Sequence, residues 1–263
     1  MQLPEIDELL ARTHIVTLPL VTRFRGVEAR EVAIIRGTVA WSEFSPFLEY
    51  EDAEAASWLR AALEFGFDAT LPRVADGEIW VNATVPAVDA SALDGVLARF
   101  DGCRTAKIKV AERGQTLADD VARVSGVRAR LGADARLRID ANGGWSVDEA
   151  IEALRELSRF GLEYAEQPCA TTAELVELRR RLVEAGIPVE IAADESIRKA
   201  EDPLEVARLG AADVIVVKMQ PLGGVRRAAE IVEAAGLPAT VSSALDSSVG
   251  IAMGAQLAAA LGA

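Results

Sequence analysis

Histidine and cysteine are nearly absent from this chain, which removes several kinds of reactive site. His14 is the only histidine among 263 residues, so we expect no Ser-His-Asp triad, His-Asp dyad or HExxH zinc site. Cys103 and Cys169 are the only cysteines and do not form a CxxC motif. They give no basis for a disulfide framework or a thiolate zinc site, and we expect two buried, unreactive thiols.

Basic residues and long apolar runs are also scarce. Lysine and arginine number 28 against 41 acidic residues, a formal net charge of −13. Binding to a phosphate backbone or an anionic membrane needs clustered positive charge, so we expect neither nucleic acid nor membrane as a partner. No apolar run reaches the roughly 20 residues that span a bilayer, and the first residues lack the basic segment of a secretion signal. The expected location is therefore cytoplasmic.

What the chain does contain is a regular alternation of strand-like and helix-like segments. Short β-branched runs alternate with stretches whose apolar residues recur at three and four and which end in glycine, such as 117–132, 146–161 and 226–236. This rhythm predicts parallel strand–helix units and favours a (β/α) barrel over a doubly wound sheet. The seven expected strands are 80–87, 105–111, 136–144, 162–169, 189–196, 214–221 and 239–245.

The residues that precede this alternation of strands and helices have a different pattern. Segments 13–21 and 27–37 are typical of hairpin strands, and 52–67 is typical of a helix. We therefore expect an N-terminal α+β capping subdomain over residues 1–78 and a (β/α) barrel over 79–263. A complete barrel has eight strands, and the eighth is missing from the pattern.

Charged and polar side chains recur near the carboxyl ends of the expected strands, the rim on which barrel enzymes assemble their active sites. They follow one another at intervals of about one strand–helix unit. In chain order they are Lys107 and Lys109, Asp140 and Asn142, Glu166, Asp194, Lys218, and Ser242 with Ser243.

Three of these residues form a candidate metal site. Carboxylates gathered on one rim repel one another unless a cation neutralises them. The all-oxygen set of Asp140, Glu166 and Asp194 suits Mg²⁺, and Mn²⁺ is a chemically similar substitute. The alternative is that they are unrelated helix caps or surface charges.

The lysines form a candidate acid–base set. Lys107 and Lys109 are two residues apart on a strand, so their side chains point to the same face, where they oppose Lys218. Amines close together and near a divalent metal tend to have lowered pKa values, which allows one of them to act as a base. Arg138 and Asn142 flank Asp140 at the same period of two and are placed to support it. The alternative is that these lysines are solvated strand ends.

These segments resemble motifs of the muconate-lactonising subgroup of the enolase superfamily. Lys107-Ile108-Lys109 resembles its KxK motif, and Arg138-Ile139-Asp140-Ala141-Asn142 resembles its D-x-N strand. Glu166-Gln167-Pro168 is similar to EQP, Ala193-Asp194-Glu195-Ser196 is similar to the DES motif, and Lys218 matches the second lysine. The motifs occur in the family's order, and the similarity covers most of the barrel region.

Within the subgroup, three further segments resemble the o-succinylbenzoate synthase family: Arg23–Gly26, Trp41–Phe47 and Ser242–Ser248. This resemblance implies a hydro-lyase of menaquinone biosynthesis that dehydrates 2-succinyl-6-hydroxy-2,4-cyclohexadiene-1-carboxylate to o-succinylbenzoate. It implies Mg²⁺ held by the three carboxylates, with Lys109 and Lys218 as catalytic residues. Its small-molecule carboxylate substrate would contact Lys107, Asn142, Ser242 and Ser243.

Several alternatives remain open on the sequence. The subgroup also contains muconate cycloisomerases, dipeptide epimerases and N-succinylamino acid racemases, and the racemase activity can accompany synthase activity. Outside the superfamily, the alternatives are a non-catalytic metal-binding barrel and an aldolase that uses Lys218 as a Schiff base. The sequence predicts no oligomeric state.

Overall fold

The computed structural model describes residues 3–24, 27–73, 78–198 and 202–262. The chain forms two compact units. The first comprises Met1–Ile79, Val216–Ala234 and Ala239–Ala263, and the second comprises Trp80–Ile215 and Ala235–Pro238. The boundary after residue 78, expected from the sequence, stays a prediction.

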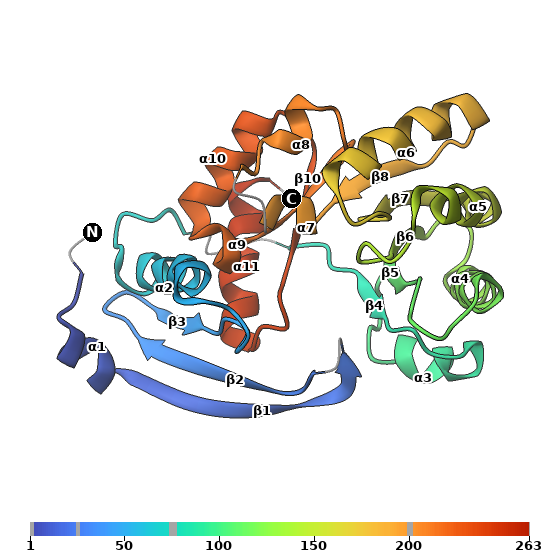
Figure 1. Ribbon diagram of the computed structural model, residues 1–263. Coiled ribbons are helices and arrows are strands. Elements are labelled where there is room, and N and C mark those ends of the chain that lie inside the picture. The colour runs from blue at the N-terminus through green and yellow to red at the C-terminus, as the bar shows by residue number, and fades with distance from the viewer. Residues whose placement is uncertain (1–2, 25–26, 74–77, 199–201, 263) are drawn as a thin grey trace. The chain divides into compact units, whose positions relative to one another are not determined.

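The first unit contains the antiparallel sheet expected near the N-terminus. Its strands lie in the order β1 (Thr13–Phe24), β2 (Val27–Arg36), β3 (Trp41–Phe44), after a short helix α1 (Ile6–Ala11) (Figure 1). Helix α2 (Asp52–Phe67) packs against β2 and β3. The buried side chains of Ile35, Ala62 and Phe67 form an apolar cluster at this contact. The predicted hairpin and helix are confirmed.

Close packing of α2 on the turn after β2 depends on a glycine. A Cβ on Gly37 would lie 2.0 Å from the carbonyl oxygen of Gly66, nearer than atoms can approach. The same carbonyl accepts the main-chain N–H of Val39 at 2.9 Å. Gly37 therefore allows the backbone contact that joins the sheet to its helix.

All seven strands predicted from residue 80 onward are present, in one sheet with the order β10-β9-β8-β7-β6-β5-β4. Each pair from β4 to β9 is parallel. Their neighbours in space are their neighbours in sequence, as in a (β/α) barrel. The strands are β4 (Ala83–Val85), β5 (Thr105–Lys109), β6 (Arg136–Asp140), β7 (Leu162–Glu166), β8 (Glu190–Ala193), β9 (Val214–Lys218) and β10 (Ala239–Ser242).

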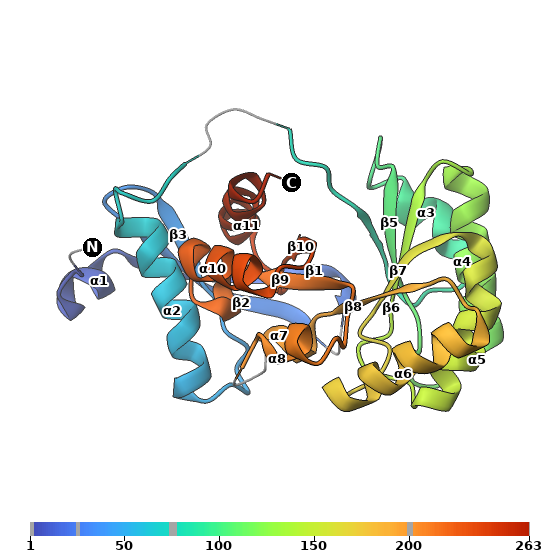
Figure 2. The ribbon, with the colours of Figure 1, turned by 90° about the horizontal axis from the view of Figure 1, so that it is seen from above.

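Helices connect the strands of the second unit. Three of the longer helices begin at a Thr or Ser whose hydroxyl pairs with the acidic residue three positions later, a capping box that satisfies the first free N–H groups. Helix α5 packs between its neighbours α4 and α6, and the three helices lie near the strands that they connect (Figure 2). The helices are η1 (Ala90–Ala92), α3 (Leu93–Leu97), α4 (Leu117–Leu131), α5 (Val147–Leu157), η2 (Ser158–Phe160), α6 (Thr172–Ala185), α7 (Glu195–Arg198) and α8 (Glu205–Arg208).

The C-terminal part of the first unit contains α9 (Met219–Leu222), α10 (Val225–Ala235) and α11 (Ser248–Ala260). Helix α2 contacts α9, and the Glu64 carboxylate of α2 accepts the main-chain N–H of Val225 at 2.6 Å. Helix α11 packs on β3 and β10. These contacts join the N-terminal layer to the last strand–helix segments within one unit.

The two thiols differ in their surroundings. Cys169 is fully buried, and burial raises the pKa of its thiol to about 12, so it is unreactive as predicted. Cys103 is only half-buried, which corrects the expectation that both cysteines are buried.

Over the ranges that the structure describes, no helix has the length and hydropathy needed to cross a membrane.

Candidate active site

Two lysines and two carboxylates form a buried network at the carboxyl ends of β5, β6 and β7. The strand register places Lys109 beside Asp140, and Asp140 beside Glu166. Lys107 Nζ lies 2.9 Å from Glu166 Oε1 and 3.1 Å from Asp140 Oδ2. Lys109 Nζ lies 2.5 Å from both Asp140 Oδ2 and Asn142 Oδ1. These contacts bring the five side chains together, and the roles predicted for them stay predictions.

The network separates the pKa values of its two amines. Burial alone would lower the pKa of Lys107, but Glu166, Asp140 and Asp194 more than offset it, and the pKa is raised. For Lys109, burial lowers the pKa, the Lys107 charge lowers it further, and Asp140 only partly opposes them. Burial would raise the pKa of Asp140, yet the two ammonium groups hold it well below its usual range. Lys109 is thus the amine that loses its proton more readily.

The third predicted carboxylate, Asp194, follows β8 and is held through its main chain. Its N–H donates to Gln167 Oε1 at 3.0 Å, and the Gln167 amide also donates to Ser196 Oγ and the Cys169 carbonyl, each at 2.9 Å. The Asp194 side chain is buried, and its charge helps to raise the pKa of Lys107. Gln167 therefore links the segment after Glu166 to the segment that carries Asp194. From the sequence, Gln167 was recognised only as part of a motif, and no role was predicted for it.

Two residues just beyond the strands have left-handed backbone conformations. Asn142 has φ +48° and Gln167 has φ +38°, values that non-glycine residues rarely adopt. The Asn142 N–H donates to Asp140 Oδ1 at 3.0 Å, and its side-chain amide donates to Glu195 Oε1 at 3.3 Å. Gly143 N–H donates to the Gln167 carbonyl at 2.7 Å. These hydrogen bonds hold two sharp turns next to the carboxylates. Left-handed backbone of this kind at non-glycine residues is common at functional sites.

The carboxylates fit a shared cation, although a complete metal site is not formed. Asp140 and Glu166 each present one oxygen to the same cationic nitrogen, Lys107 Nζ. Within the described ranges, no three His, Cys, Asp or Glu side chains are grouped closely enough to hold a metal ion. The assignment of Asp140, Glu166 and Asp194 as metal ligands therefore stays a prediction.

The remaining predicted site residues belong to the first unit. Lys218 ends β9 and is buried, with 6% of its surface exposed. Ser242 ends β10 and is half-buried, and Ser243 follows it and is exposed. Their predicted roles remain predictions. Of the Arg23–Gly26 segment, residues 25–26 lie outside the described residues.

A charged cluster in the first unit was not predicted as a site. Arg30 stacks over the Phe47 ring at 4.3 Å and donates from Nε to the Leu245 carbonyl at 3.3 Å. Glu43 accepts the Ser45 hydroxyl at 2.6 Å and, through Oε2, the Gly250 N–H at 3.0 Å. Burial, followed by the Glu43 charge, raises the pKa of Asp246 to about 7.

Sequence reasoning had little means of finding this cluster, because its members come from segments about 200 residues apart. The only signal was that Glu43 and Asp246 lie in two of the segments that resemble a known family.

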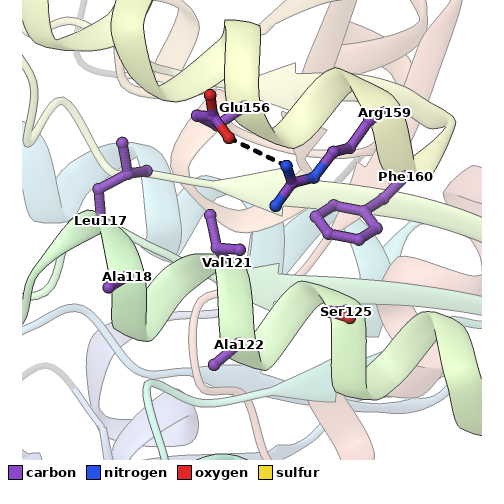
Figure 3. A pocket seen from close by; sticks show the side chains of 8 residues that line it. All are labelled: Leu117, Ala118, Val121, Ala122, Ser125, Glu156, Arg159 and Phe160. Carbon is purple, nitrogen blue, oxygen red and sulfur yellow. Dashed lines mark ion pairs between the residues drawn. The ribbon is translucent and has the colours of Figure 1, made fainter.

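A pocket of about 670 Å³ lies away from these residues, on the helical layer of the second unit. Figure 3 shows Leu117 and Val121 of α4 facing Phe160 and the ion pair between Glu156 and Arg159. None of the predicted site residues lines it.

Comparison with known families matches both parts of the chain. A family described as enolase C-terminal domain-like matches residues 92–263, and one described as enolase N-terminal domain-like matches residues 15–66. The o-succinylbenzoate synthase of Mycolicibacterium smegmatis is 55% identical over 259 residues, covering 98% of this chain and 78% of the relative. That of Mycobacterium marinum is 55% identical over 257 residues, covering 97% and 76%.

Solved structures share the fold at lower identity. The dipeptide epimerase from Enterococcus faecalis, complexed with Mg and a dipeptide, has a TM-score of 0.76 at 24% identity, over 93% of this chain and 85% of that one. Muconate lactonizing enzyme from Pseudomonas putida has a TM-score of 0.70 at 22% identity, over 93% and 82%. The family matches, the relatives and the parallel sheet with its lysines and carboxylates agree, and the chain belongs to the enolase superfamily.

Proposed function

We propose that this protein is an o-succinylbenzoate synthase, a lyase that removes water from 2-succinyl-6-hydroxy-2,4-cyclohexadiene-1-carboxylate. The observation that carries the proposal is 55% identity to a synthase of that name over 98% of this chain. The amine and carboxylate network at the ends of β5 to β7 provides groups suited to that chemistry. A role in menaquinone biosynthesis and a cytoplasmic location belong to the same proposal.

Lys109 is the proposed base. It takes the proton from the carbon next to the substrate carboxylate and then returns a proton to the departing hydroxyl, so that water leaves and the ring becomes aromatic. Its pKa is lowered by burial and by Lys107, which favours the neutral amine that this step needs. Asn142, whose side-chain oxygen lies 2.5 Å from Lys109 Nζ, orients that amine.

The other residues bind the substrate and balance charge. Asp140, Glu166 and Asp194 are the proposed ligands of Mg²⁺, for which Mn²⁺ would be a substitute, because three buried carboxylates form an all-oxygen donor set. Bound Mg²⁺ would stabilise the negative charge that develops on the substrate carboxylate. Lys218 would remain cationic and stabilise the same charge. Lys107, Asn142, Ser242 and Ser243 are the proposed substrate contacts.

The test is an assay of the purified protein with Mg²⁺ on the cyclohexadiene substrate and, separately, on an N-succinylamino acid. Dehydration should be rapid, and Lys109→Ala should lower its rate about 10² to 10⁴-fold. Arg155→Ala, on the exposed side of α5, is the control and should match the wild type. Racemisation without dehydration would replace the proposal with the racemase alternative, and normal turnover by Lys109→Ala would refute the assigned base.

A further inference from the structure

A buried arginine on α4 holds the main chain at the carboxyl end of β5. The Arg123 side chain is only 1% exposed. Its Nε donates to the Val88 carbonyl at 2.7 Å, and Nη1 donates to the Lys109 carbonyl at 2.9 Å. Nη2 donates to Gln115 Oε1, and the Gln115 amide donates to the Ala87 carbonyl at 2.9 Å. One guanidinium thereby ties the segment after β4, the end of β5 and the start of α4 together.

Asp120, one turn earlier on α4, completes this clamp. Its Oδ1 accepts Arg123 Nη1 at 2.8 Å, and its Oδ2 accepts the Ala111 N–H at 3.0 Å. Ala111 has φ +58°, a left-handed conformation that is unfavourable for an alanine and persists only where its surroundings impose it. Between the two clamped residues, Val110 N–H donates to the Asp140 carbonyl at 3.0 Å. The three residues that end with Ala111 are therefore fixed from both sides.

This arrangement suits a positioning role more than a contribution to stability alone. A buried ion pair adds little net stability, because desolvation offsets most of its attraction. The hydrogen bonds of Arg123, by contrast, reach the main chain of Lys109, whose side-chain nitrogen lies 2.5 Å from both Asp140 and Asn142. A displacement of about 1 Å in a reacting group can cost about 10²-fold in rate.

We infer that Arg123, together with Asp120, is a positioning residue that holds the backbone of Lys109 so that its amine points at the reacting carbon. The inference rests on the proposed function, in which Lys109 is the base.

The same helix provides a matched control. Arg128, also on α4, donates to the Phe160 carbonyl from Nε at 3.0 Å and to the Ala135 carbonyl from Nη1 at 2.7 Å. Those carbonyls precede β7 and β6, at the amino ends of the strands, where barrel residues serve stability rather than catalysis. Arg123 and Arg128 thus make the same kind of bond at opposite ends of the sheet.

The experiment compares Arg123→Met, Arg123→Lys and Arg128→Met with the wild type. It measures kcat and KM for dehydration, thermal stability, and hydrogen exchange of the main-chain amides of Val110 and Ala111. Arg123→Met should lower kcat about 10 to 100-fold with KM changed less than about threefold, and the two amides should exchange faster. Arg123→Lys keeps the positive charge but can form fewer hydrogen bonds, so its kcat should lie between those of Arg123→Met and the wild type. Arg128→Met should lose stability but keep kcat within about twofold.

The outcomes separate this inference from the proposed function. A folded Arg123→Met with wild-type kcat, or a kcat loss no larger than that of Arg128→Met, would overturn the positioning role alone. If Arg123→Met does not fold, Arg123→Lys decides, and an unchanged kcat in that variant also overturns it. A wild type that turns over neither substrate would refute the proposed function, while the exchange of Val110 and Ala111 would still show whether Arg123 fixes this segment.

Discussion

Asp246→Asn should remove a pH-dependent loss of stability from the first unit. Asp246 follows β10 and, although the residue is only partly buried, its carboxyl group is shielded from water beside Glu43 on β3. Burial, and then the Glu43 charge, raises its pKa from 3.8 to about 7. The Ala244 N–H, at 3.3 Å, and the charges of Arg30 and Lys218 oppose this shift without cancelling it.

The sign and size follow from proton linkage. Below pH 3.8 the folded and unfolded forms are both protonated, and the group costs no stability. Between 3.8 and about 7 the folded state retains a proton that the unfolded chain has released, so the free energy of unfolding falls by about 1.4 kcal/mol per pH unit. Above pH 7 the loss is constant, at about 4 kcal/mol. From pH 5 to pH 8 the wild type should lose roughly 2 to 3 kcal/mol through this group.

The assay is urea unfolding at pH 5 and pH 8 at one ionic strength. The free energy of unfolding of Asp246→Asn, relative to that of the wild type, should be roughly 2 to 3 kcal/mol higher at pH 8 than at pH 5. Glu31→Gln, which removes an exposed carboxylate from β2 of the same unit, is the control and should follow the wild-type profile. A stability difference between Asp246→Asn and the wild type that is equal at both pH values would show that Asp246 does not titrate in this range.

Three further predictions concern packing, charge and metal. Gly250→Ala should destabilise the protein by about 1 to 3 kcal/mol, because its Cβ would lie 2.7 Å from Asp246 Cβ and 2.9 Å from Glu43 Cδ. Gly254→Ala, one turn along α11 with open space around it, should instead raise the melting temperature, and equal effects would contradict the packing argument. Lys218→Arg should lower the dehydration rate about 10²-fold, since a planar guanidinium cannot replace a compact ammonium; wild-type kcat in that variant would exclude the role. Chelation should abolish turnover, with recovery on adding Mg²⁺ or Mn²⁺, and activity that survives exhaustive chelation would exclude the metal.

The sequence by itself determined the strands and much of the candidate site. Each parallel strand is a short β-branched run between amphipathic helices, so its place could be read from local periodicity. The period of two along β5 put Lys107 and Lys109 on one face, and the order of the strands made Asp140 and Glu166 neighbours in register. These features depend only on residues close in sequence or on adjacent strand–helix units.

Only the tertiary structure decided how the charges pair. Lys107 bridges Asp140 and Glu166, and Lys109 bonds Asp140 and Asn142, an arrangement that separates the pKa values of two chemically identical amines. Arg123 looked like an ordinary charge on an amphipathic helix, yet it is buried against the Lys109 carbonyl. A guanidinium's partners depend on where distant segments of backbone come to lie, and no local sequence pattern specifies that placement.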